Sequence, residues 1–117
     1  MSWNIEFYKT KEGNIPVEDF VDSVPVNHRA KILSMIKLLT EYGLLIKGPY
    51  AKHIVGTSLK ELRIQASPNI YRILYFAYVN KTIVLLHGFT KKTEQIPRRE
   101  IETAINRMND YIRRNNE

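Results

Sequence analysis

The sequence predicts an α+β fold, in which helices pack on a small antiparallel or mixed sheet in the order β-α-α-β-β-β-α. Apolar and polar residues alternate in residues 3–8, and short apolar segments follow at 59–66, 70–79 and 82–89. Residues 26–42 and the segment from residue 97 onward instead repeat apolar residues every three or four positions, as amphipathic helices do. A chain of 117 residues suits one domain, 1–117, with one core. We expect the helices to cover one face of the sheet.

The N-terminal third predicts a strand and two helices. Trp3, Ile5 and Phe7 alternate with polar residues, as in a half-buried strand. Pro16 suits the first turn of a short helix that ends near Val24, and Pro25 starts the next helix. The apolar stripe expected for the helix over 26–42 comprises Ala30, Leu33, Ile36 and Tyr42, together with Leu38 and Leu39. Gly43 suits a left-handed helix end.

The middle of the chain predicts a loop and then three strands. Residues 47–56 are basic and interrupted by glycines, so we expect a long loop that can close over a cleft. The continuously apolar segment 70–79 favours a central strand, covered on both faces. Asn80 and Lys81 predict a two-residue hairpin turn. Alternation in the next strand places His87 on the same face as Ile83, Leu85 and Phe89.

The composition excludes several classes of site. The chain has no cysteine, so a disulfide framework, a thiol nucleophile and a cysteine-based zinc site are excluded. The three histidines lack partners at ligand spacing, and we predict no metal site and no cofactor. The first ten residues resemble no signal peptide, and no apolar run approaches the length of a membrane span. We therefore expect a cytoplasmic protein without a membrane partner.

The positive charge is concentrated in the middle of the chain. The formal net charge is +6, and residues 47–99 alone carry ten basic and two acidic residues. Such a concentration indicates a polyanionic partner, first of all RNA or DNA, although solvated surface lysines would give the same count.

Four cations are expected to converge on the three adjacent strands. Arg63 and Arg72 lie on neighbouring predicted strands, and Lys91 and Lys92 end the third. Arg72 lies within an apolar segment, where an unpaired charge is costly to bury. It therefore either pairs with an acid such as Glu61 or faces a functional cleft.

These same segments resemble a known family. The runs Leu59–Arg63, Tyr71–Phe76, Ile83–Thr93 and Pro97–Ile101, in this order, resemble the RelE/ParE toxin superfamily, and most closely its HigB-like, phage-derived branch. The resemblance implies a toxin of a type II toxin–antitoxin system, either bacterial or encoded by a prophage. It implies a metal-independent endoribonuclease that cuts messenger RNA, usually on the ribosome, with a helix-turn-helix, HigA-like antitoxin as partner. The pair would bind operator DNA only through the antitoxin.

The resemblance also implies roles for individual residues. Attack of a ribose 2′-OH on the adjacent phosphate places negative charge on phosphate oxygens, which fixed cations stabilise. Arg72 would hold the scissile phosphate, with Arg63 and Lys92 beside it. Glu61 replaces a lysine of RelE, and Arg98 falls near the register of a RelE tyrosine. The general base is therefore open between His53, which follows Lys52, and His87. Further RNA contacts are assigned to Lys91, Lys52, Lys60, Arg98 and His87.

Two other functions remain open at this point. The ParE branch of the superfamily poisons DNA gyrase, so this chain could be a gyrase inhibitor without nuclease activity. It could also be a non-catalytic nucleic-acid-binding module. In that case Tyr71, Tyr75 and Tyr78 would be candidates for stacking on bases, although packing in the core is their more ordinary role.

Overall fold

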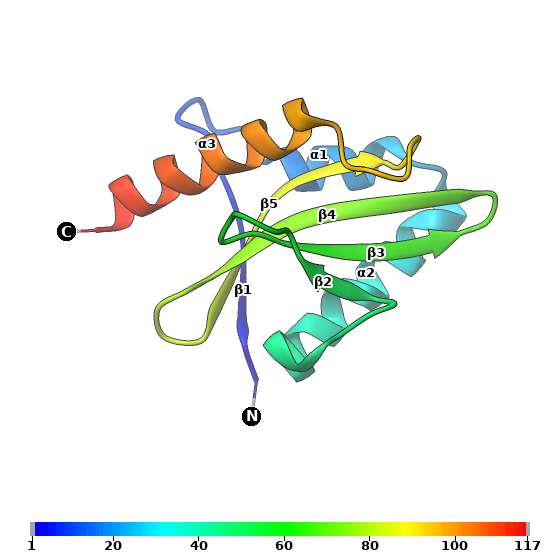
Figure 1. The fold of residues 1–117 in the computed structure, drawn as a ribbon, viewed down its shortest axis with the longest axis horizontal. Helices are drawn as coiled ribbons and strands as arrows, with labels where there is room; N and C mark the ends of the chain where they lie inside the picture. Colours follow the sequence, from blue (N-terminus) through cyan, green and yellow to red (C-terminus); the bar gives the residue numbers. More distant parts are fainter. Residues whose placement is uncertain (1, 117) are drawn as a thin grey trace.

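A computed structural model describes residues 2–116. Within these residues, five strands and three α-helices follow one another (Figure 1). The strands are β1 (Asn4–Phe7), β2 (Ala51–His53), β3 (Lys60–Ala66), β4 (Asn69–Tyr78) and β5 (Thr82–Thr90). The helices are α1 (Pro16–Ser23), α2 (Val26–Tyr42) and α3 (Arg98–Asn115), and the short 3-10 helix η1 (Gly43–Leu45) follows α2.

The strands form one mixed sheet in the order β1-β5-β4-β3-β2. Strand β1 runs parallel to β5, and the other three pairings are antiparallel. The α+β class and the mixed sheet are therefore as the sequence predicted. Residues 71–76 of the central strand β4 are buried, which explains why this segment is apolar except for Arg72.

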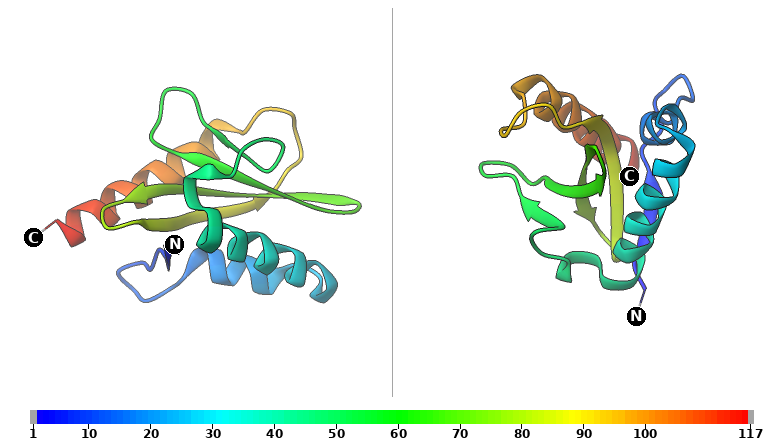
Figure 2. Two further views of the ribbon diagram at one scale, coloured as in Figure 1. Left: turned by 90° about the horizontal axis from the view of Figure 1, so that it is seen from below. Right: turned by 90° about the vertical axis from the view of Figure 1, so that its right-hand side faces the viewer.

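Helices cover both faces of this sheet, so the expectation of one covered face was wrong. Val17 of α1 and Ile32 and Leu39 of α2 pack on one face, together with Ile73 and Leu85. On the opposite face, Ala104 and Tyr111 of α3 pack on Leu74, Phe76 and Leu86. Figure 2 shows the sheet between these two layers (right-hand view). We call the two sides of the sheet the α2 face and the α3 face.

Helix α2 is rotated relative to the stripe expected from its sequence. The buried residues are His28, Ile32, Ile36 and Leu39, whereas Leu33 is 52% exposed and Tyr42 53% exposed. Two overlapping apolar stripes occur in this helix, and the sequence does not say which of them meets the sheet. Gly43 ends the helix with a φ of 53°, as predicted. A Cβ atom there would lie 2.0 Å from the indole of Trp3, so packing also requires glycine.

Part of the segment 47–56 is a strand and not a loop. Residues Ala51–His53 pair antiparallel with β3 and form the edge of the sheet. Three residues are too few for an alternating pattern to be recognised in the sequence. The hairpin between β4 and β5 also differs from the prediction, because Tyr78 pairs with Thr82 and three residues lie between them. Asn80 and Lys81 both lie in this turn, with positive φ values of 59° and 52°.

A β-bulge in β5 reverses the alternation beyond Leu86. The register shifts between the Leu74–His87 and Tyr75–Leu85 pairs, so Leu86 is an extra residue on this strand. Ile83 and Leu85 face α2, whereas Phe89 belongs to the core under α3. His87 contacts α3 side chains as well. The prediction that His87 shares a face with Ile83 and Leu85 was therefore wrong, because a bulge shifts the period of two by one residue.

Candidate nucleic-acid interface

Pairing of β2, β3 and β4 places three of the predicted cations on the α3 face of the sheet. Arg63 of β3 lies directly opposite Arg72 of β4. Lys52 of β2 lies opposite Glu61. Residues that face each other across antiparallel strands project from the same side, and residues two apart on one strand share a side. Lys52, Arg63 and Arg72 therefore project from one face, where Leu74 and Phe76 extend the same row of β4.

Arg72 is buried and paired in this structure. Its Nε lies 3.5 Å from Oε1 of Glu61, and both side chains are 4% exposed. Its guanidinium also donates a hydrogen bond of 3.1 Å to the backbone oxygen of Glu94. Of the two possibilities for Arg72, pairing with Glu61 is the one that the geometry shows. The role of Arg72 in holding a phosphate stays a prediction.

Arg63 differs from Arg72 in its exposure and its partners. It is half-buried, and no ion pair involves it among residues 2–116. Two neighbouring cavities share Arg63 and Pro49. The Lys52 cavity, of about 210 Å³, is lined by Lys52, Glu61, Arg63, Gly48, Pro49 and Ala51. The Tyr50 cavity, of about 340 Å³, is lined by Tyr50, Arg63, Gln65, Ile64, Pro49, Lys31 and Met35. Arg63 is therefore better placed than Arg72 to meet an anion from solvent.

Lys91 and Lys92 lie at the end of β5, in the segment that leads to α3. The backbone N–H of Lys91 donates to Ile70 O on β4 at 2.7 Å, which continues the sheet. Its ammonium pairs with Glu94 at 3.3 Å, and its side chain is 12% exposed. Lys92 is exposed and lines a cavity of about 260 Å³ together with Arg99 and Glu100. Only Lys92 of this pair has its charge open to solvent.

His53 and Lys60 do not join these cations. They face each other across β2 and β3 and alternate with Lys52 and Glu61, so they project toward the α2 side at the sheet edge. The exposed His53 ring hydrogen-bonds through Nε2 to the backbone oxygen of Thr57 at 2.5 Å. A carbonyl oxygen only accepts, so Nε2 carries a proton in this contact, and in the neutral ring Nδ1 then has the free lone pair. His53 can accept a proton there, but it lies on the other side of the sheet from Arg72.

His87 is held in a polar cluster between β5 and α3. Its Nε2 lies 2.6 Å from Glu100 Oε1, and Arg107 donates to its Nδ1 at 3.1 Å. Arginine only donates, so Nδ1 is unprotonated, Nε2–H donates to Glu100 and the ring is neutral. Burial lowers the pKa of His87, and the Arg107 charge acts in the same direction, while the hydrogen bond to Glu100 opposes it. His87 is thus a hydrogen-bonded strand histidine in this structure, and its role as a base or RNA contact stays a prediction.

Arg98 lies apart from these residues as well. Its side chain is 90% exposed in the first turn of α3 and pairs with Glu102 one turn later at 3.1 Å. Across the part of the chain that the structure describes, no group of three or more histidine, aspartate or glutamate side chains has the arrangement of a metal site.

Residues 19–109 match the family model "Phage derived protein Gp49-like (DUF891)". The chain belongs to this family. Members of the Gp49-like family are commonly toxin-like and of the RelE/ParE type, which agrees with the broader part of the resemblance. Family membership is consistent with a toxin of a toxin–antitoxin system and with an antitoxin as partner. No curated protein matches the sequence.

The Gp49-like match runs from α1 to α3 and includes all of β2 to β5. It therefore contains every cation discussed above. Within residues 2–116, no helix is both long enough and apolar enough to cross a membrane.

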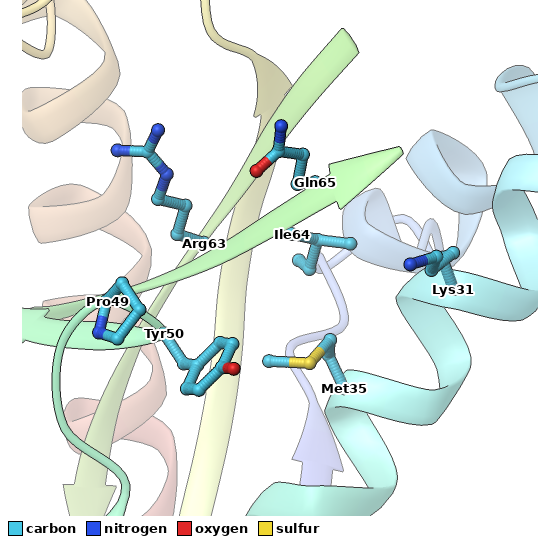
Figure 3. A pocket seen from close by; sticks show the side chains of 7 residues that line it. All are labelled: Lys31, Met35, Pro49, Tyr50, Arg63, Ile64 and Gln65. Carbon is cyan, nitrogen blue, oxygen red and sulfur yellow. The ribbon is translucent and has the colours of Figure 1, made fainter. Parts of the chain in front are cut away.

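Sequence reasoning missed several residues of this Gp49-like chain that surround Arg63. Tyr50, Gln65 and Lys31 line the Tyr50 cavity but come from a loop, a strand and a helix (Figure 3). Tyr50 is 54% exposed, although it is a large aromatic residue. Its place beside Arg63 depends on β2 pairing, which the sequence did not reveal. Arg107 was missed because only the β-bulge turns His87 toward α3.

Proposed function

We propose that this protein is the toxin of a type II toxin–antitoxin system, of the HigB-like kind, and acts as an endoribonuclease on messenger RNA. The observation that carries the proposal is the free guanidinium of Arg63 beside Lys52, on a sheet face that belongs to a Gp49-like fold. Family membership supports the toxin, and the cations support a polyanionic substrate.

The proposed reaction is attack of a ribose 2′-OH on the adjacent phosphate, which expels the 5′-oxygen and leaves a 2′,3′-cyclic phosphate. Negative charge grows on the phosphate oxygens during this step, and a preorganised cation stabilises it. Arg63 can hold two phosphate oxygens through parallel hydrogen bonds, and Lys52 adds a point charge in the same cavity. The reaction needs neither a metal ion nor a cofactor.

Arg72 is less accessible to a phosphate than Arg63, because it is buried and paired with Glu61. A phosphate that contacts its guanidinium has to compete with the carboxylate of Glu61, 3.5 Å away. We therefore assign the first phosphate contact to Arg63 and a supporting charge to Arg72. His53 remains the proposed general base through its free Nδ1, with Lys52 adjacent in sequence. Catalysis by His53 requires RNA to reach around the β2 edge, since His53 projects from the α2 side.

The proposed partners are translated messenger RNA with its ribosome, and an antitoxin of the helix-turn-helix, HigA-like kind. The antitoxin would bind the toxin and prevent RNA from reaching Arg63. Operator DNA would be bound through the antitoxin.

Expression of the protein in growing bacteria tests this function. We expect growth to stop within minutes and transcripts to break at internal positions, while the chromosome stays intact. Arg63→Ala should abolish both effects, and Arg113→Ala, at an exposed position of α3, is the matched control that should retain them. Broken DNA with intact transcripts would indicate the gyrase-directed alternative and contradict the proposal.

A further inference from the structure

We infer that the Tyr50 cavity is a nucleotide subsite, in which a base of single-stranded RNA stacks on Tyr50 while the neighbouring phosphate lies on Arg63. This inference rests on the proposed function and names where the nucleotide beside the attacked phosphate is held. The cavity lies next to the Lys52 cavity, and the two share Arg63 and Pro49.

Tyr50 presents an exposed aromatic side chain on a fixed backbone. Tyr50 is 54% exposed, although its apolar neighbour Ile64 is buried and Met35 is partly buried against the core. Its backbone is nonetheless fixed, because Tyr50 O accepts a hydrogen bond of 2.8 Å from Arg63 N and Tyr50 N donates to Lys47 O at 3.1 Å. An exposed aromatic ring on a fixed backbone offers a stacking surface at little entropic cost. Aromatic side chains of this kind hold unpaired bases in RNA-binding proteins.

The Tyr50 cavity has a suitable size and charge for a nucleotide. Its volume of about 340 Å³ is large enough for one nucleoside, and the described residues that line it include no acid. Arg63 on β3 and Lys31 on α2 lie in different directions from Tyr50, with Met35 between Tyr50 and Lys31 (Figure 3). A base on Tyr50 would have Arg63 on the β3 side and Lys31 across the cavity, so each cation can meet one of the two phosphates that flank an internal nucleotide.

The edge of β3 forms one wall of the Tyr50 cavity. The backbone N–H of Arg63 donates to Tyr50 O, immediately before Ala51, the first residue of β2. Gln65 lies two residues further on the same side of β3 and is exposed. Its amide supplies both a donor and an acceptor for the edge of a base. The subsite thus combines stacking by Tyr50 with a polar group that can distinguish bases.

The test measures binding of a fluorescently labelled 2′-O-methyl RNA oligonucleotide, which lacks the attacking hydroxyl and cannot be cleaved by the proposed reaction. Tyr50→Leu should weaken binding about ten- to a hundredfold, the effect of losing one base–aromatic stack. Tyr50→Phe, which keeps the ring, should bind like the parent. Tyr42→Leu is the matched control, because Tyr42 is equally exposed at 53% but does not line the cavity.

An abasic residue moved along the oligonucleotide then locates the stacked base. At one position the abasic RNA should bind the parent and Tyr50→Leu equally well, since ring and base contribute only together. Equal binding of the unmodified sequence by parent and Tyr50→Leu overturns the inference. So does a loss of antitoxin binding without a loss of RNA binding, which would identify the cavity as a protein contact. Cleavage of ordinary RNA, measured in parallel, tests the proposed function separately, because a protein that binds through Tyr50 without cutting would refute only that function.

Discussion

At the scale of single residues, two arginines in register on adjacent strands have different environments. Arg72 is covered by the segment that leads to α3 and shares its charge with Glu61. Arg63 lies one strand closer to the edge, beside two cavities. Distance from the sheet edge therefore separates an arginine buried in an ion pair from one that borders two cavities. The sequence could place both residues on strands but could not show this difference, because it did not reveal strand β2.

We predict that removing Arg72 alone destabilises the fold, whereas removing its whole ion pair does not. Arg72→Met leaves the buried carboxylate of Glu61 without a partner, which costs about 3–5 kcal/mol of unfolding free energy. The double variant Glu61→Gln with Arg72→Met removes both charges and should recover most of this loss. Urea unfolding of the parent and the two variants measures the difference. Equal stability of parent and Arg72→Met would show that the pair contributes nothing.

The same double variant separates structure from function at Arg72. If it folds but no longer stops growth, the positive charge of Arg72 is needed for activity. If it folds and remains toxic, the contribution of Arg72 is structural and Arg63 is the main phosphate ligand.

Lys91 and Lys92 also differ at the residue scale, and their difference predicts a salt dependence. The charge of Lys91 is paired with Glu94, whereas Lys92 is open to solvent. Lys92→Ala should therefore reduce the slope of log affinity for RNA against log salt by about one unit. Lys91→Ala should change it much less. Binding titrations at several salt concentrations measure both slopes, and an equal change for the two variants would contradict the pairing seen here.

At the scale of elements, the contact between β5 and α3 depends on the bulge at Leu86. The bulge turns His87 toward α3, where the ring accepts from Arg107 and donates to Glu100. A second set of contacts holds the far end of α3, since Tyr8 donates to Asp110 at 2.6 Å and Tyr111 donates to Glu6 at 2.7 Å. Helix α3 is thus attached at both ends by polar side chains and in the middle by apolar ones.

Because His87 is neutral in this contact, the fold should lose stability as the solution is acidified. The pKa of His87 is lowered in the folded state, first by burial, so the unfolded chain binds the proton more tightly. The contribution of His87 is complete above its unfolded pKa, near 6.5, and is lost as the pH falls toward the folded value. Thermal unfolding measures this loss when it is followed from about one pH unit above that pKa to about one unit below it.

A variant and a control assign the effect to His87. His87→Gln should flatten the pH dependence in this range, because glutamine keeps a polar side chain that does not titrate. His53→Gln, at an exposed position, should leave it unchanged. A pH dependence that persists in His87→Gln would show that another group is responsible.

At the scale of the whole molecule, periodicity predicted most of the fold but not the side on which each residue lies. The longer strands, the three helices and Gly43 follow from apolar spacing and from the special geometry of glycine and proline. Among the strands, the predictions failed in two places. The extra residue Leu86 shifts the alternation of β5, and strand β2, with three residues, is too short to show an alternating pattern. The α2 stripe was misjudged because two sets of apolar residues compete on that helix. The charged residues were predicted as a cluster, and strand pairing then separated Lys52, Arg63 and Arg72 from His53 and Lys60.

The whole-molecule arrangement also accounts for the concentration of charge. Residues 47–99, which carry the excess, form strands β2 to β5 and the segment that reaches α3. Helix α3 packs on residues of β4 and β5, whereas the two cavities beside Arg63 lie at the β2–β3 edge of the sheet. An RNA strand can therefore approach Arg63 along the sheet edge without displacing a helix.

The chemical ends of broken transcripts test the central claim most directly. Transcripts from cells that express the parent protein should carry 2′,3′-cyclic phosphates upstream of each break and 5′-hydroxyls downstream of it. These ends arise only when the neighbouring 2′-OH attacks the phosphate, and Arg63→Ala should eliminate them while the protein stays folded. Breaks that carry 3′-hydroxyl and 5′-phosphate ends, or cyclic ends that persist in Arg63→Ala, would contradict the account.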